Sequence, residues 1–87
     1  MQVTMLSTPE CVQCRMTAQE LEKLGIEYLV IDLSESDAAL EWCREHDFRQ
    51  APVLVVGDMA SNDFDAWTGF RPDRIKALGD RISGGAQ

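Results

Sequence analysis

The stretch VTMLSTPECVQCRMT, residues 3–17, contains the features that decide the fold. Residues 3–6 are short and rich in β-formers, and the Ser-Thr-Pro sequence that follows closes the strand. From Val12 onward the apolar residues recur at near-helical spacing. The stretch therefore predicts a strand, a tight connection and a helix, with Cys11 and Cys14 at the start of that helix.

Strand and helix signals alternate along the rest of the chain. Residues 28–33 form an apolar run that is broken only by Asp32, which predicts a buried strand. A second helix is expected to begin at a serine N-cap, either Ser34 or Ser36. The remaining predicted elements are a strand over residues 53–56, a short strand over residues 65–68 and a final helix that begins near Pro72.

The predicted order of elements is βαβαββα, which places the chain in the α/β class. The opening βαβ unit is expected to be parallel and right-handed. The last two strands are close enough in sequence to form an antiparallel hairpin. The sequence thus predicts a thioredoxin-like fold, with one four-stranded mixed sheet and helices on both faces. We expect a single domain over residues 1–82 and a flexible C-terminal tail over residues 83–87.

Composition limits the kinds of partner. The chain has 15 acidic and 8 basic residues and a formal net charge of −7, which opposes nonspecific nucleic-acid binding. No apolar run approaches the roughly 20 residues that span a bilayer. The N-terminus lacks the basic region and the cleavage site of a signal peptide, and three cysteines are too few for a secreted disulfide scaffold. We expect a monomeric, cytoplasmic protein that binds neither nucleic acid nor membrane.

The Cys-x-x-Cys spacing leaves three kinds of site open: a structural disulfide, part of a metal site, or a redox pair. A disulfide across so short a loop constrains the unfolded chain little. Cys43 and His46 would complete a zinc site, but consecutive helices of this fold lie on opposite faces of the sheet. A helix N-terminus lowers the pKa of a thiol, which makes Cys11 the expected nucleophile and Cys14 the expected resolving cysteine.

Three segments, in this order and at this separation, resemble the NrdH-redoxins. They are Cys11-Val12-Gln13-Cys14, Gln50-Ala51-Pro52-Val53 and Trp67-Thr68-Gly69-Phe70-Arg71-Pro72-Asp73-Arg74-Ile75. The resemblance covers nearly the whole chain, and the last segment is the most specific. It implies a glutaredoxin-type fold and a dithiol–disulfide electron carrier without a cofactor of its own. The implied partners are the large subunit of class Ib ribonucleotide reductase, which is reduced, and thioredoxin reductase, which restores the dithiol.

The same resemblance implies the rest of the site. Val12 and Gln13 match a variable pair that helps to set redox poise and partner contact. Ala51 and Pro52 match a loop with a cis proline, whose backbone can receive an extended substrate peptide. The segment over residues 67–72 lies where glutaredoxins bind glutathione, but in this family it does not form that pocket. The partner-binding residues expected in this segment are Trp67, as a partly exposed aromatic platform, Thr68, Gly69, Phe70 and Arg71.

Two alternative functions remain open, and one loop differs from the pattern of the family. The first alternative is a glutathione-dependent glutaredoxin, and the second is a zinc- or iron–sulfur-binding module that uses Cys11 or Cys14. The departure is the loop over residues 58–66, which is longer than the usual connection of the family. We interpret it as tolerated surface in preference to a device for partner choice.

Overall fold

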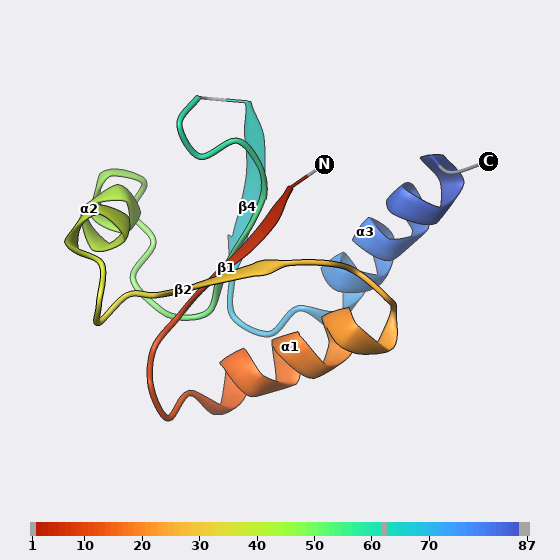
Figure 1. Ribbon diagram of the computed structural model, residues 1–87, viewed down its shortest axis with the longest axis horizontal. Helices are drawn as coiled ribbons and strands as arrows, with labels where there is room; N and C mark the ends of the chain where they lie inside the picture. Colours follow the sequence, from red (N-terminus) through yellow and green to blue (C-terminus); the bar gives the residue numbers. More distant parts are fainter. Residues whose placement is uncertain (1, 62, 86–87) are drawn as a thin grey trace.

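The computed structural model describes residues 2–61 and 63–85 (Figure 1). Its elements are β1 (Val3–Ser7), α1 (Val12–Lys23), β2 (Leu29–Asp32), α2 (Asp37–Glu45), β3 (Val53–Gly57), β4 (Phe64–Thr68) and α3 (Pro72–Gly85). The order βαβαββα is confirmed. Helix α3 continues to Gly85, so it includes residues 83–85, which were expected to begin the C-terminal tail. Residues 86–87 of the expected tail lie outside the described residues.

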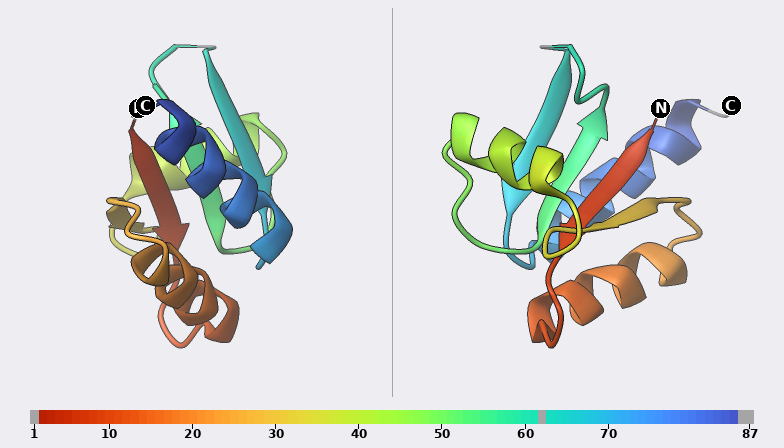
Figure 2. Two further views of the ribbon diagram at one scale, coloured as in Figure 1. Left: turned by 90° about the vertical axis from the view of Figure 1, so that its right-hand side faces the viewer. Right: turned by 60° about the vertical axis from the view of Figure 1, so that its left-hand side comes forward.

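The strands form one mixed sheet in the order β2-β1-β3-β4. Strand β1 pairs with β2 in parallel and with β3 in antiparallel orientation, and β3 and β4 form the expected hairpin. Helices α1 and α3 cover one face of the sheet, and α2 covers the other (Figures 1 and 2). This is the predicted thioredoxin-like arrangement of glutaredoxin type. Helix α1 follows β1 in the chain, so it starts at the carboxyl end of β1. The parallel strand β2 ends at the same edge of the sheet.

Two clusters of buried side chains lie on the two faces of the sheet. The α1/α3 cluster comprises Val3, Met5, Leu21, Ile26, Leu54, Val56, Trp67, Ile75 and Leu78, and the α2 cluster comprises Leu6, Cys43, Val53 and Val55. Strand β1 contributes to both, because successive side chains of a strand point to opposite faces. Met5 faces α1 and α3, whereas Leu6 faces α2. The two helical layers are thus held to one sheet by alternate residues of the same strand.

The expectation that β2 is a buried strand was wrong. Leu29 is 55% exposed and Val30 is 54% exposed. Strand β2 lies at the edge of the sheet and pairs with β1 alone. Only its second half reaches the core, where Ile31 packs against the α2 cluster. An apolar run therefore predicted the strand correctly, but it did not tell an edge strand from a central one.

The loop between β3 and β4 closes the core on the α2 face. Met59 of the loop and Phe64, the first residue of β4, pack against the α2 cluster. The indole Nε1 of Trp42 donates a hydrogen bond of 3.1 Å to the Met59 carbonyl, and its ring lies 5.3 Å from that of Phe64. At the start of the loop Gly57 has φ +119°, and a Cβ there would come within 2.7 Å of the Asp63 carbonyl oxygen. The long loop thus covers apolar side chains of the α2 cluster and has a role in packing, in addition to being a surface connection.

Candidate active site

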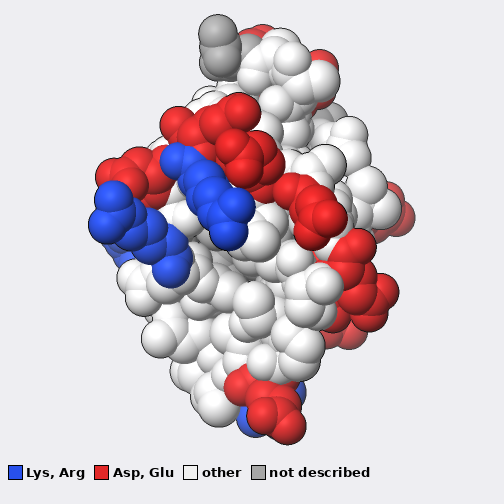
Figure 3. Space-filling view, turned by 90° about the vertical axis from the view of Figure 1, so that its left-hand side faces the viewer, with Lys and Arg blue, Asp and Glu red and all other residues white. Residues whose placement is uncertain are grey.

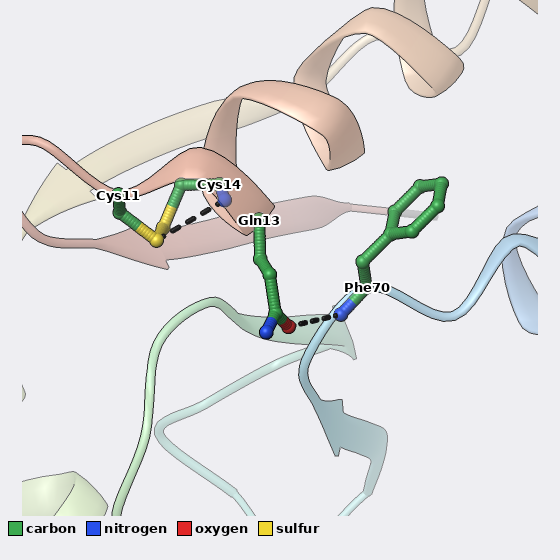
Figure 4. Close-up of a disulfide and its surroundings, with 4 residues drawn as sticks. All are labelled: Cys11, Gln13, Cys14 and Phe70. Carbon is green, nitrogen blue, oxygen red and sulfur yellow. Dashed lines mark hydrogen bonds between the residues drawn. A yellow bond between two sulfur atoms is a disulfide. The ribbon is translucent and has the colours of Figure 1, made fainter.

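Cys11 and Cys14 lie at the N-terminus of α1 and form a disulfide (Figure 4). Their Cα atoms are 5.2 Å apart. Cys11 is the N-cap residue, and its sulfur accepts a hydrogen bond of 3.1 Å from the Cys14 amide. Cys14 is only 5% exposed, while Cys11 is partly exposed. When the pair is reduced, the unpaired N–H groups and the helix dipole favour a thiolate at Cys11.

Gln13 connects the cysteine motif to the segment that precedes α3. The Phe70 amide donates a hydrogen bond of 3.0 Å to the Gln13 side-chain oxygen across 57 positions of the sequence (Figure 4). A Cβ at Gly69 would lie 3.3 Å from the same oxygen, and Gly69 has φ +81°. Glycine at this position therefore allows both the backbone conformation and the close approach. The resemblance implied a role for Gln13 in redox poise and partner contact, and no local signal in the sequence pointed to this bond.

The loop before β3 supplies the third part of the site. The Ala51–Pro52 peptide bond is cis, as the resemblance implied. The Pro52 carbonyl accepts a hydrogen bond of 2.9 Å from the Gly69 amide. Through this bond and the one from Phe70 to Gln13, the structure brings together three segments that are far apart in the sequence.

A hollow of about 620 Å³ adjoins the loop before β3 on the α2 side. Its lining includes Thr8, Ala51, Phe48 and the buried thiol of Cys43. On this side of the molecule charged side chains gather over the upper part and along one flank, a mostly uncharged area lies below them, and acidic and basic side chains appear again at the bottom (Figure 3). The exposed side chains next to the cysteines include Glu10 and Arg15 as well as Val12, so a partner there would meet charged and apolar groups together.

The expectation that Trp67 is an exposed platform was wrong. Trp67 is only 7% exposed and belongs to the α1/α3 cluster. It lies opposite Leu54 in the β3–β4 ladder, and its side chain shares the face of the sheet that α1 and α3 cover. The Arg74 guanidinium lies 5.2 Å from the centre of its ring. Trp67 is therefore a core residue.

The other residues of the segment remain accessible to different degrees. Thr68, Gly69 and Phe70 are partly exposed, and Phe70 also packs against the α1/α3 cluster. Arg71 is exposed and makes two hydrogen bonds to Asp73 in the first turn of α3, of 3.2 and 3.0 Å. These bonds lower the pKa of the Asp73 carboxyl and raise the pKa of the Arg71 guanidinium. The Arg71 charge is thus directed toward α3.

The structure does not bring Cys43 and His46 to the cysteine pair. Cys43 is 3% exposed within the α2 cluster, on the opposite face of the sheet from α1. His46 is the C-cap of α2, and its ring lies 4.3 Å from that of Trp42. Within residues 2–61 and 63–85, no group of three or more Cys, His, Asp or Glu residues could hold a metal ion. Cys43 therefore behaves as a small core residue.

Reduced protein should show two very different classes of thiol. Burial raises the pKa of the Cys43 thiol, and the thiolate is the form that reacts with alkylating reagents. We expect iodoacetamide at neutral pH to modify Cys11 first and to leave Cys43 unmodified in the folded protein. Mass spectrometry of the intact and digested protein would measure this order. In denaturant all three cysteines should react; modification of folded Cys43 at the rate of Cys11 would contradict the buried assignment.

Comparison with known proteins gives the class of the chain. Residues 3–60 match the model of the glutaredoxin family. The chain is similar to the thioredoxin-like protein BC3987, with a TM-score of 0.74 at 19% identity over 88% of this chain and 99% of that one, which supports the fold. The matched residues include the Cys11–Cys14 disulfide at the start of α1. The chain is a glutaredoxin-like protein.

More specific relatives define the branch of the family. The chain is 36% identical to the glutaredoxin-like protein NrdH of Escherichia coli K12 over 90% of this chain and 89% of that protein. It is 33% identical to NrdH of Lactococcus lactis subsp. cremoris over 87% of this chain and 97% of that protein. The solved structure of E. coli NrdH-redoxin matches with a TM-score of 0.80 over 90% of this chain and 95% of that one. The chain belongs to the NrdH glutaredoxin-like proteins.

Proposed function

We propose that this protein is a thiol–disulfide electron carrier in which Cys11 and Cys14 are the redox pair. The observation that carries the proposal is the Cys11–Cys14 disulfide at the N-terminus of α1, with the more exposed sulfur at the N-cap. Such a position favours the thiolate of Cys11. The buried Cys14 is close enough to form the disulfide again without a change of fold.

The reaction proceeds in two exchanges. The Cys11 thiolate attacks one sulfur of a partner disulfide, forms a mixed disulfide and releases the other partner sulfur as a thiolate. Cys14 then loses its proton and attacks the Cys11 sulfur, which restores the Cys11–Cys14 disulfide and releases the second partner thiolate. The partner gains two electrons, and its two thiolates take up protons from the solvent.

The proposed partners follow from the relatives and from the site. The NrdH relatives and the resemblance support the large subunit of class Ib ribonucleotide reductase as the protein that is reduced. A solved relative, E. coli NrdH-redoxin, is described as having a thioredoxin-like activity profile, which supports thioredoxin reductase as the electron donor. In this chain the Phe70 amide, in the region where glutaredoxins bind glutathione, is already bonded to Gln13.

The proposal also covers the location of the protein in the cell, its oligomeric state and the surface that contacts the partner. None of the described helices is long and apolar enough to cross a membrane. We place the carrier in the cytoplasm, as a monomer. The partner would contact Val12, which is 58% exposed, together with Ala51 and the segment over residues 68–71.

The choice of electron donor is tested by two parallel assays. Oxidised protein is mixed with NADPH and either thioredoxin reductase or glutathione with glutathione reductase, and the loss of NADPH is followed. We expect turnover with thioredoxin reductase and at least roughly tenfold slower turnover with glutathione, since the Phe70 amide is occupied. The Cys11→Ser variant should be inactive in both assays. Faster turnover with glutathione would instead support the glutaredoxin alternative.

A further inference from the structure

A buried hydroxyl without a hydrogen-bond partner lies close behind the cysteine pair. Thr17 is 0% exposed, and its Oγ1 atom has no partner. In a helix a threonine hydroxyl commonly bonds a carbonyl of the preceding turn, but Thr17 does not. A buried, unpaired hydroxyl destabilises the fold, so its presence calls for an explanation.

Thr17 shares its side of α1 with Cys14. The buried residues of α1 are Cys14, Thr17 and Leu21, and residues three or four positions apart lie on one face of a helix. Thr17 is thus one turn behind the resolving cysteine, on the side that faces the sheet.

Among the described residues 2–61 and 63–85, the buried residues with polar side chains other than tryptophan are Thr4 and Thr17. The indole Nε1 of Trp67 is also buried on the α1/α3 face and has no hydrogen-bond partner. Thr4 is two positions from Leu6 on β1, so it shares the face that α2 covers. Besides the Trp67 indole, the buried polar group on the α1 side is therefore the Thr17 hydroxyl, and among the residues described this side holds no buried carboxylate or imidazole.

The structure shows the oxidised pair, in which the Cys14 sulfur is bonded to Cys11 and carries no proton. Reduction breaks this bond with two electrons, and the Cys14 sulfur takes up a proton from the solvent, so Cys14 then presents a buried S–H group beside the Cys11 thiolate. We propose that the Thr17 hydroxyl is the hydrogen-bond partner of the Cys14 sulfur in the reduced protein, and that Thr17 is a positioning residue for the resolving cysteine. This inference rests on the proposed redox function.

The same contact would act in the second exchange. Cys14 must lose its proton to the solvent before its sulfur attacks Cys11, and a buried thiolate needs a donor in place of water. The Thr17 hydroxyl can donate to the thiolate without gaining or losing a proton itself. When the disulfide forms, the hydroxyl again lacks a partner. Thr17 therefore favours the dithiol over the disulfide.

The test compares Thr17→Val, which keeps the shape and removes the hydroxyl, with Thr17→Ser, which keeps the hydroxyl. Each protein is equilibrated with mixtures of reduced and oxidised dithiothreitol, and the oxidised fraction is measured by alkylation and mass spectrometry. We expect the equilibrium constant of Thr17→Val to shift about tenfold toward the disulfide, which is about 30 mV. Thr17→Ser should remain close to the wild-type value.

A second measurement is independent of that equilibrium. In a Cys11→Ser, Cys43→Ala background, the thiolate of Cys14 is titrated by its ultraviolet absorbance with and without Thr17→Val. The hydroxyl should lower the pKa of Cys14, so its removal should raise that pKa. A purely structural role would change the unfolding free energy of oxidised and reduced protein equally. It would move neither the equilibrium constant nor the titration, and that result would overturn the inference.

The two levels of the proposal can fail separately. If the wild-type pair does not exchange with dithiothreitol at all, the proposed redox function is wrong. If the wild type exchanges and Thr17→Val matches it in both measurements, the redox function stands and the role of Thr17 is wrong. The role of Thr17 is also wrong if Thr17→Ser, which keeps the hydroxyl, shifts as far as Thr17→Val.

Discussion

Cys14→Ser is expected to accumulate a mixed disulfide between Cys11 and the partner, whereas Cys11→Ser is expected to lose turnover by several orders of magnitude. The reason is the asymmetry of the pair. Cys11 is the accessible N-cap of α1, and Cys14 is 5% exposed. Without the Cys14 sulfur, the first exchange can still occur but the second cannot. Nonreducing electrophoresis after mixing with an oxidised partner would measure the trapped complex.

Cys43→Ala is the matched control for this pair of variants. Cys43 lies in the α2 cluster, on the other face of the sheet from α1. It should trap no complex and should keep the wild-type turnover. Peptide mapping of the trapped complex identifies the linked residue. A complex joined through Cys14 in the Cys11→Ser variant, in place of one through Cys11, would reverse the assigned roles.

Trp67→Ala is expected to lower the free energy of unfolding by about 3–5 kcal/mol. The loss would be a large part of a total that for a domain is about 5–15 kcal/mol. Trp67 is buried in the α1/α3 cluster, where its ring fills space between β4 and the helices. Urea denaturation followed by circular dichroism would measure the change.

Trp67→Phe separates the packing of the ring from its N–H group. The indole Nε1 of Trp67 has no hydrogen-bond partner, so phenylalanine loses ring volume but also removes a buried, unpaired donor. We expect this variant to be clearly more stable than Trp67→Ala. A Trp67→Ala variant as stable as the wild type would contradict the core role of Trp67.

Local signals in the sequence predicted the elements and the placement of the cysteines. A strand, a proline and a periodic helix are properties of neighbouring residues, and they placed Cys11 at a helix N-terminus. The cis bond at Pro52 came from the resemblance and was confirmed. The elements and the placement of the cysteines could be predicted because each depends on a short segment of the chain.

The features that were missed depend on register and on contacts between distant residues. The side of β4 on which Trp67 lies follows from its pairing with Leu54, which periodicity did not supply. The exposure of Val30 follows from the position of β2 at an edge of the sheet. The bond between Phe70 and Gln13 joins residues 57 positions apart. Strand register, the position of a strand in the sheet and contacts between distant residues cannot be read from a single segment of the sequence.

Because the Phe70 amide donates a hydrogen bond to Gln13, the four-residue cysteine motif cannot be replaced by the motif of another protein without affecting the segment before α3. A substitution between the two cysteines would ordinarily be made to adjust redox properties alone. In this protein a residue at position 13 without a side-chain acceptor also leaves the Phe70 amide unpaired, at the segment proposed to contact partners. Motif exchange would thus change electron affinity and partner preference together, and the two effects could be separated only by a second substitution beyond the motif.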